Sequence, residues 1–284
     1  MDIESKKFLG QPKNFVSIFN ALLFDGQQVL KPEYLKDENS ELVMNVSSKH
    51  VDIIKRYEDG TYLDLFVIES QSYVDPSMVA RVMEYESVAR MRYIRQNFKK
   101  HVPMHTRLPM ILTVVLYVGE SKWNAAKRLS ELEIIHPGFE DMFNEFKLNL
   151  IELNTNHKYN TGEKATQDFF DLLRMIYRKQ ILKEDLDREF NRDALYFAYV
   201  VTKNKELLNI YQESEKGDVK VCRALDEMFE ESTNKGIQMG IKQGIELNQF
   251  EVYQTMLDKG FSVKDIASIF SVSEESIKKL LMKA

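Results

Sequence analysis

Hydrophobic residues in the first third of the chain change spacing from helical to strand-like. Residues 13–24 carry apolar side chains at helical intervals, which predicts a first helix. Residues 51–57 and 62–70 are instead rich in β-branched and apolar side chains, and the dipeptide Asp59-Gly60 lies between them. Such a dipeptide between two β-rich runs indicates a hairpin with a tight turn.

Further patterns after the hairpin complete an α/β core. We expect a second helix with Asp75 as its N-cap and Pro76 in its first position, ending near residue 98. The continuous apolar run 109–118 predicts a strand buried on both faces, and the alternating run 146–153 predicts another. Residues 42–46 would form a short edge strand.

The remainder of the chain is predicted to be helical. Amphipathic patterns cover residues 164–183, 189–208 and 219–231. Glycines then recur at every fourth position, at Gly236, Gly240 and Gly244, which predicts a marginal helix or hinge. We therefore expect a core at 1–160, a helical extension packed on the core at 161–233, and a Gly-punctuated tail at 234–284.

The end of the chain resembles a helix-turn-helix over residues 261–280. Ser262 and Ser273 are each followed by an acidic residue in a pattern close to a capping box. In a DNA-reading motif the second helix enters the major groove. Glu274 and Glu275 lie at the start of that helix and would repel phosphate. This favours a protein-facing helix pair over a reader of DNA sequence.

The predicted hairpin brings two carboxylates together. With a loop of only Asp59 and Gly60, Glu58 faces Thr61 and Asp52 faces Val67. Asp52, Glu69 and Gln71 then share one face of the sheet, and the two acids are diagonal neighbours with Cβ atoms about 7 Å apart. Such a pair can bind one hard divalent cation, although two ordinary solvent-facing carboxylates would give the same pattern.

This ordered set of residues resembles the recombination-promoting nucleases, a putative transposase family in the PD-(D/E)XK nuclease superfamily. The resemblance is densest over residues 8–120. The motifs that carry it are Asp52, an apolar strand, Glu69-Ser70-Gln71, Ser72, Met78, Arg81 and Tyr85, preceded by Asn14-Phe15-Val16-Ser17 and Leu23-Phe24-Asp25-Gly26. Gln71 stands where the wider superfamily usually has Lys. Ser17 stands where many relatives carry an acid.

The resemblance implies a fold and a chemistry. The fold would be a central mixed sheet flanked by helices, of the restriction-endonuclease-like type, with an all-helical C-terminal region. Asp52, Glu69 and the Ser70 carbonyl would bind Mg²⁺, with Mn²⁺ as a substitute, and Gln71 would assist catalysis. Arg81 and Tyr85 would hold the substrate phosphate. The activity would be that of an endodeoxyribonuclease acting in recombination or transposition.

Composition limits where such a protein would act. The sequence has 284 residues, 44% of them hydrophobic, with a net charge of −5 and a single cysteine, Cys222. No apolar run approaches the ~20 residues that span a bilayer. We therefore expect a cytoplasmic protein with no membrane partner.

The acidic net charge does not favour DNA binding, because non-specific affinity for DNA comes mainly from cations. Positive side chains nevertheless gather after the hairpin, at Arg81, Arg90, Arg92, Arg95, Lys99, Lys100, His101 and Arg107. This cluster is either a DNA-contact surface or a solvated helix face.

Two other functions stay open at this stage. The chain could be a catalytically inactive protein that uses the nuclease fold for binding or assembly, forming a homo-oligomer through its C-terminal helices. It could also be an anti-phage effector that cleaves invading DNA with the same chemistry.

Overall fold

The computed structural model describes residues 3–38, 53–60, 63–181, 183–214 and 217–281. The chain divides into two compact units, Met1–Leu225 and Asp226–Ala284. Each unit has its own hydrophobic core. In the part of the chain described, no helix combines the length and the apolarity needed to cross a membrane.

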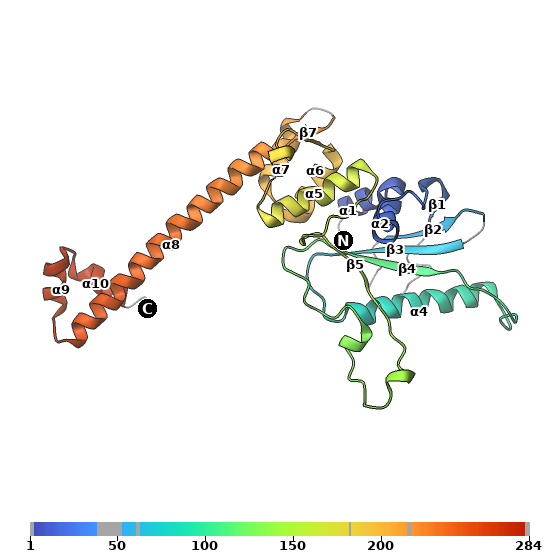
Figure 1. Ribbon diagram of the computed structural model, residues 1–284, viewed down its shortest axis with the longest axis horizontal. Helices are drawn as coiled ribbons and strands as arrows, with labels where there is room; N and C mark the ends of the chain where they lie inside the picture. The colour runs from blue at the N-terminus through green and yellow to red at the C-terminus, as the bar shows by residue number, and fades with distance from the viewer. Residues whose placement is uncertain (1–2, 39–52, 61–62, 182, 215–216, 282–284) are drawn as a thin grey trace. The chain divides into compact units, whose positions relative to one another are not determined.

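The first unit is built on a five-stranded mixed sheet in the order β1-β2-β3-β4-β5 (Figure 1). The strands are β1 Leu35–Asp37, β2 Ile53–Glu58, β3 Leu63–Gln71, β4 Ile111–Tyr117 and β5 Asn149–Glu152. The first three strands pair antiparallel, and β3, β4 and β5 pair parallel. The predicted α/β fold with a central mixed sheet is confirmed.

Helices cover both faces of this sheet (Figure 1). They are α1 Ile3–Gly10 and α2 Pro12–Phe24 on one face, and α4 Met78–Asn97 on the other. Phe19 of α2 stacks on Phe66 of β3, with ring centroids 4.8 Å apart. On the opposite face, Val67 of β3 packs in one cluster with Tyr85 and Ala89 of α4. The alternation of side chains along β3 therefore sends one set of residues to α2 and the other to α4.

The predicted register of the hairpin is wrong by two residues. Glu58 pairs with Leu63 rather than with Thr61, and Val67 faces Ile54 rather than Asp52. Because the offset is an even number of residues, the faces on which the side chains lie are unchanged.

Other boundaries also differ from expectation. The predicted strand at 42–46 lies outside the described residues, and the edge strand observed is β1, which the sequence did not predict. The run 146–153 is a strand only over β5. Asp75 does not cap α4: Ser77 occupies the N-cap position, and Asp75 instead accepts hydrogen bonds from the backbone N–H and the hydroxyl of Ser77.

Short helices and a small hairpin complete the first unit. They are α5 Lys164–Arg178, β6 Glu189–Phe190, α6 Arg192–Thr202, α7 Lys205–Glu213 and β7 Val219–Lys220, with 3-10 turns at Pro32–Tyr34, Leu129–Glu131, Glu140–Met142 and Lys183–Asp185. The single helix predicted over 189–208 is wrong. Asn191 caps α6, Lys203 adopts a left-handed conformation, and Asn204 caps α7, so the chain turns between two helices.

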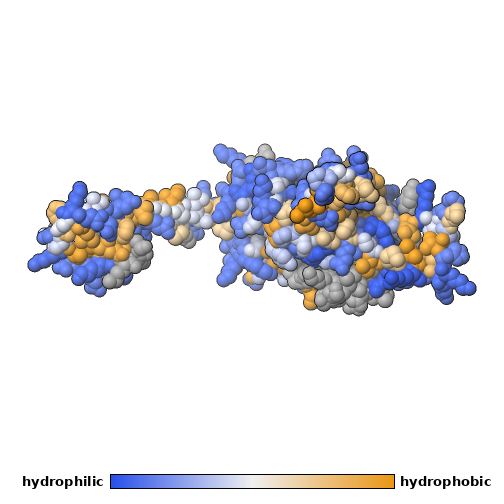
Figure 2. Space-filling model, turned by 90° about the horizontal axis from the view of Figure 1, so that it is seen from below, coloured by the Kyte–Doolittle hydropathy of each residue, from blue (hydrophilic) through white to orange (hydrophobic). Residues whose placement is uncertain are grey.

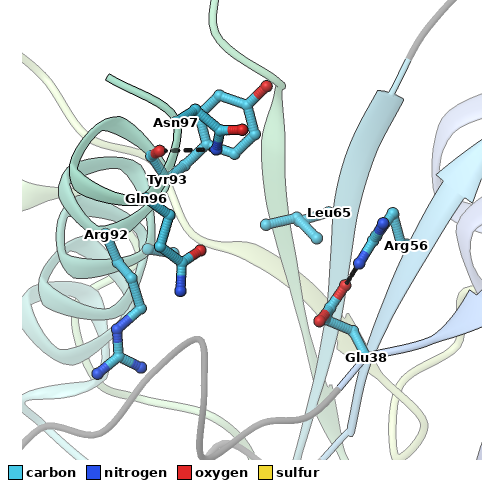
Figure 3. A pocket seen from close by; sticks show the side chains of 8 residues that line it. Glu38, Arg56, Leu65, Arg92, Tyr93, Gln96 and Asn97 are labelled. Atoms are coloured by element: carbon cyan, nitrogen blue, oxygen red, sulfur yellow. Dashed lines mark hydrogen bonds and ion pairs between the residues drawn. The ribbon is translucent and has the colours of Figure 1, made fainter. Parts of the chain in front are cut away.

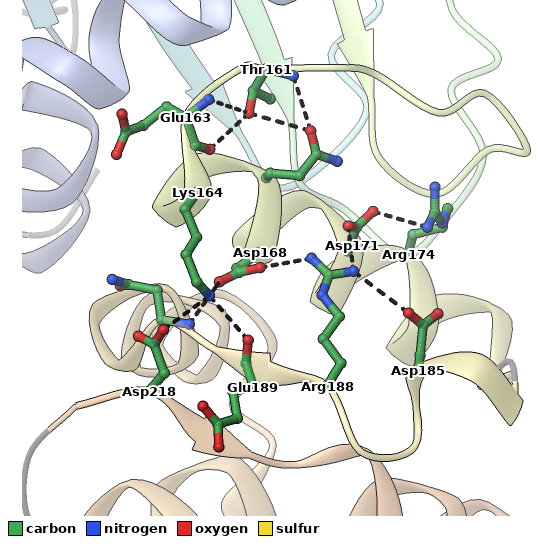
Figure 4. Close-up of polar contacts among 12 residues, drawn as sticks. Thr161, Glu163, Lys164, Asp168, Asp171, Arg174, Asp185, Arg188, Glu189 and Asp218 are labelled. Atoms are coloured by element: carbon green, nitrogen blue, oxygen red, sulfur yellow. Dashed lines mark hydrogen bonds and ion pairs between the residues drawn. The ribbon is translucent and has the colours of Figure 1, made fainter.

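A buried charge network joins α5 to the small hairpin (Figure 4). Asp168 is 1% exposed and accepts hydrogen bonds from Lys164, Arg188 and the backbone N–H of Asn191, each at 2.7 Å. Arg188 also donates to Asp171 at 2.9 Å. The hydrogen bonds to Asp168 compensate for removing its charge from water.

The second unit is helical, and α8 Cys222–Asp258 leads into it, followed by α9 Val263–Phe270 and α10 Glu274–Leu281. Tyr253, Ile266 and Ile277 form its buried core. The predicted capping box is present, since Ser262 and Asp265 each accept a hydrogen bond from the other's backbone N–H. The predicted helical C-terminal region is therefore confirmed, and α8 runs through Gly236, Gly240 and Gly244 without a break.

Candidate active site

The end of β3 places two polar side chains between the sheet and α4. Glu69 and Gln71 lie on the same face of the strand as Val67, which packs against α4. Glu69 is 4% exposed and Gln71 is 5% exposed. A buried carboxylate and a buried amide at the end of a strand are costly unless they are partnered or functional.

Arg81 connects this strand to α4. Its guanidinium donates to Glu69 Oε1 at 3.1 Å, to Asp75 Oδ2 at 2.5 Å and to the Tyr85 hydroxyl at 2.9 Å. Arg81 and Tyr85 lie four residues apart on one helix face, as the sequence predicted. The structure thus brings Glu69, Arg81 and Tyr85 together, and adds Asp75, whose role here no sequence signal indicated.

The protonation of this group is set by burial and by the hydrogen bonds. Burial acts to lower the pKa of Arg81, but the bonds to Asp75 and Tyr85 outweigh it and raise that pKa. Burial also acts to raise the pKa of Asp75, but the bonds from Ser77 and Arg81 hold it below its ordinary value. Burial raises the pKa of Tyr85. The guanidinium and the Asp75 carboxylate are therefore both charged at neutral pH.

Gln71 has an unsatisfied donor. Its Nε2 atom is buried and has no hydrogen-bond partner among the described residues. Leaving such a group unpaired costs about 1–3 kcal/mol. Its backbone carbonyl is used, because it accepts the N–H of Val118. The backbone of Gln71 is therefore hydrogen-bonded within the sheet, and only its side-chain amide lacks a partner among the described residues.

Asp52 and the pairing predicted for it lie outside the described residues. The described part of β2 begins at Ile53, the covalent neighbour of Asp52. Ile53 pairs with Ile68, the covalent neighbour of Glu69. The placement of Asp52 as a metal ligand stays a prediction, as does that of the Ser70 carbonyl.

The donors at the end of β3 suit a hard cation. Glu69 already has a cationic group at 3.1 Å, the guanidinium of Arg81, so this position accommodates positive charge. Across the described ranges, no group of three or more His, Cys, Asp or Glu side chains could hold a metal ion.

Two further expectations concern residues around the site. Ser17, at the position where relatives carry an acid, is fully buried and donates to Thr166 Oγ1 at 2.8 Å, so it joins α2 to α5. Within the predicted basic cluster, Arg90 bonds to Glu86 at 2.8 Å. Several other members are exposed, namely Arg95, Lys99, Lys100, His101 and Arg107. Contact between this cluster and DNA stays a prediction.

Comparison with known proteins gives one match. A family model described as "Putative transposase, YhgA-like" matches residues 6–207, well over half of the 284 residues. The matched range contains the sheet, α4 and every residue of the candidate site. No curated protein and no solved structure matches the chain.

Proposed function

The chain belongs to the YhgA-like putative transposase family, as its sequence motifs predicted. From this membership and the geometry at Glu69, we propose that it is a Mg²⁺-dependent endodeoxyribonuclease with a PD-(D/E)XK-type core. It would hydrolyse phosphodiester bonds of DNA during recombination or transposition.

One observation carries this proposal. A buried carboxylate, Glu69, and a buried amide, Gln71, whose donor has no partner within the described ranges, share one face of β3 beside the guanidinium of Arg81. Neither side chain stabilises the core as an apolar residue of the same size would. Side chains retained at such a cost are typical of sites that bind a charged ligand.

Each residue of the site then has a role. Asp52, Glu69 and the Ser70 carbonyl would hold Mg²⁺, which when bound lowers the pKa of a water ligand and stabilises charge on a phosphoryl oxygen. The Gln71 Nε2 donor would orient the attacking water or bond to a phosphate oxygen. Both tasks need a hydrogen-bond donor, and the Gln71 amide supplies one that has no other partner among the described residues.

Arg81 and Tyr85 would bind the substrate phosphate. The guanidinium has several N–H donors in a fixed plane and suits phosphate oxygens. In the structure it bonds to two carboxylates, those of Glu69 and Asp75. We propose that a cation on Glu69 would release the first of these bonds, while Asp75 keeps the guanidinium in position.

The proposal is tested by titrating the protein with Mg²⁺ and Mn²⁺ in a calorimeter. Wild-type protein should bind the metal, and Glu69→Gln should lose this binding while its fold is unchanged. Asp64→Asn is a matched control, because Asp64 lies on the same strand but on the opposite face. Equal metal binding by wild-type and Glu69→Gln protein would overturn the assignment.

A second function is favoured by the ion pair itself. Since Arg81 already neutralises Glu69, the chain could keep the fold without metal chemistry and act in binding or assembly. Such a protein would show no carboxylate-dependent metal site in the same titration.

The C-terminal helices supply a surface for assembly in either case. Ile237, Ile241 and Ile245 of α8 are each more than half exposed, and hydrophobic surface is visible along this helix in Figure 2. Exposed apolar side chains repeated at this spacing form one face of a helix. We propose that this face, here called the α8 apolar face, joins copies of the chain into a homo-oligomer.

A further inference from the structure

The connection from β4 to β5 contains a loop that projects from the first unit. Its two arms are joined near the sheet, where the N–H of Leu129 donates to the Phe146 carbonyl at 2.9 Å. The 3-10 turns Leu129–Glu131 and Glu140–Met142 give the loop a defined shape. In Figure 1 it extends away from the sheet beside the start of α4. Residues 131–142 are here called the acidic loop.

The acidic loop exposes apolar and acidic side chains together. Its exposed large apolar side chains are Leu132, Ile134, Phe139 and Met142. Its exposed acidic side chains are Glu131, Glu133, Glu140 and Asp141. Apolar side chains gathered on one short exposed loop are typical of a surface that contacts another protein. The acids indicate that the surface of this partner carries cations.

A surface of this kind follows α4. The helix ends at Asn97, whose side chain donates to the Tyr93 carbonyl at 2.9 Å (Figure 3). The next residues, 99–108, form neither helix nor strand and are here called the basic segment. Its exposed side chains include the cations Lys99, Lys100 and Arg107 and the apolar residues Val102, Met104 and Leu108.

The two surfaces lie at opposite ends of α4 (Figure 1). Phe143 and Phe146, just after the acidic loop, pack against a cluster that contains Met78 and Val82 from the first turns of the helix. The basic segment follows the last turn. Because α4 has 20 residues, its ends are about 30 Å apart. A contact between the acidic loop and the basic segment is therefore made between two copies of the chain.

The basic segment fits the acidic loop better than it fits DNA. Phosphates of DNA would meet its cations but would offer no apolar surface to Val102, Met104 and Leu108. The acidic loop offers both carboxylates and apolar side chains. Complementary charge and apolar surface thus favour a second copy of the chain as the partner.

We propose that the acidic loop of one copy binds the basic segment of a second copy. The apolar side chains of the loop pack on Val102, Met104 and Leu108. Its acids face Lys99 and Lys100. Because every copy carries both surfaces, two copies related by a two-fold axis make the contact twice. Two short surfaces bury little area, so the contact is weak and is lost on dilution.

The test cross-links two forms of the full chain that carry tags of different size. One form has Met142→Cys and the other has Met104→Cys, and a short bismaleimide is added to their mixture. The mixed dimer should form about ten-fold faster than it does when Met91→Cys replaces Met142→Cys, because a bound partner raises the effective concentration of the thiols. Met91 is the matched control, since it is exposed on α4 and belongs to neither surface. Cys222 is buried and present in every mixture, so it adds the same background to each.

An exchange of charges tests the ionic part of the contact. Glu140→Lys combined with Asp141→Lys in the Met142→Cys form should lower the rate of cross-linking to that of the control. Lys99→Glu combined with Lys100→Glu in the other form should then restore most of the rate, because the charges are again opposite. A loop that had merely lost its shape would not be rescued by changes in the other copy.

Equal rates with Met142→Cys and Met91→Cys, or no rescue by the exchanged charges, would overturn the proposal. It would also be overturned if Lys99→Glu with Lys100→Glu abolished binding of an oligonucleotide while the loops did not cross-link, because the basic segment would then belong to DNA. The contact needs neither metal nor cleavage, so its failure would leave the proposed function intact.

Discussion

At the scale of single residues, Asp75 makes the stability of the site depend on pH. Its pKa is held below the ordinary value of 3.8 by bonds from Ser77 and Arg81, against the opposing effect of burial. A carboxyl with a lowered pKa stabilises the fold above its unfolded-state pKa, and this stability is lost as the pH falls through the folded-state pKa.

We therefore expect Asp75→Asn to lower the free energy of unfolding by about 1–2 kcal/mol at neutral pH. The difference from wild type should shrink as the pH is lowered below about 4. Urea unfolding at a series of pH values measures it, with the exposed Asp141→Asn as a control for loss of one charge. A difference that stays constant down to acidic pH would contradict this account.

Gln71 should separate stability from activity. Its buried Nε2 atom has no hydrogen-bond partner among the residues described, so Gln71→Met should leave the free energy of unfolding unchanged or raise it by up to about 1 kcal/mol. The same change should lower the rate of DNA cleavage about 100-fold, as loss of an active-site donor does. Urea unfolding and a plasmid cleavage assay measure the two effects. A loss of stability of several kcal/mol would show that the amide has a structural role instead.

At the scale of secondary structure, the sequence predicted the elements that follow one clear period. The helix before the sheet, β4 and α4 appear where the apolar spacing placed them. The faces of β3 were also predicted, since they depend only on alternation. The placement of Glu69 and Gln71 on one face of β3 was therefore predicted correctly.

Errors occurred where connections decide the structure. The register of β2 and β3 differs from the predicted one, because a turn dipeptide does not reveal how many residues pair on each side of it. The helix ends at Lys203, although the apolar pattern of the sequence continues on both sides of this residue. The contacts of Asp75 with Arg81 depend on how the loop before α4 folds back, which has no sequence period.

The hydrogen bonds of Asp168 hold α5 against the small hairpin of β6 and β7, so their loss should lower the stability of the fold. Asp168→Asn should lower the free energy of unfolding by about 3 kcal/mol, because it removes the buried carboxylate that accepts charge-assisted hydrogen bonds from both Lys164 and Arg188, and Arg188 then keeps only its pairs with Asp171 and Asp185. Asp187→Asn is the matched control, since the pair of Asp187 and Arg223 is exposed to solvent and its loss should leave the stability nearly unchanged. Thermal and urea unfolding measure both, and equal effects would contradict a structural role for the buried network.

At the scale of the whole molecule, the α8 apolar face predicts self-association. Wild-type protein should be oligomeric in light scattering coupled to size exclusion, and Ile241→Glu should reduce its mass to that of one chain, because it places a charge in the interface. Met239→Glu is the control, since Met239 is equally exposed but lies on another side of the helix. A monomeric wild-type protein, or identical behaviour of the two variants, would exclude this interface.

The central claim is that the carboxylates at the end of the hairpin make this family member a metal-dependent nuclease. The most direct measurement is the rate at which supercoiled DNA is cut in Mg²⁺ by wild-type protein and by Asp52→Ala combined with Glu69→Ala. We expect cutting by the wild type that EDTA abolishes, and none by the folded double variant. Cutting by the double variant at the wild-type rate would contradict the claim.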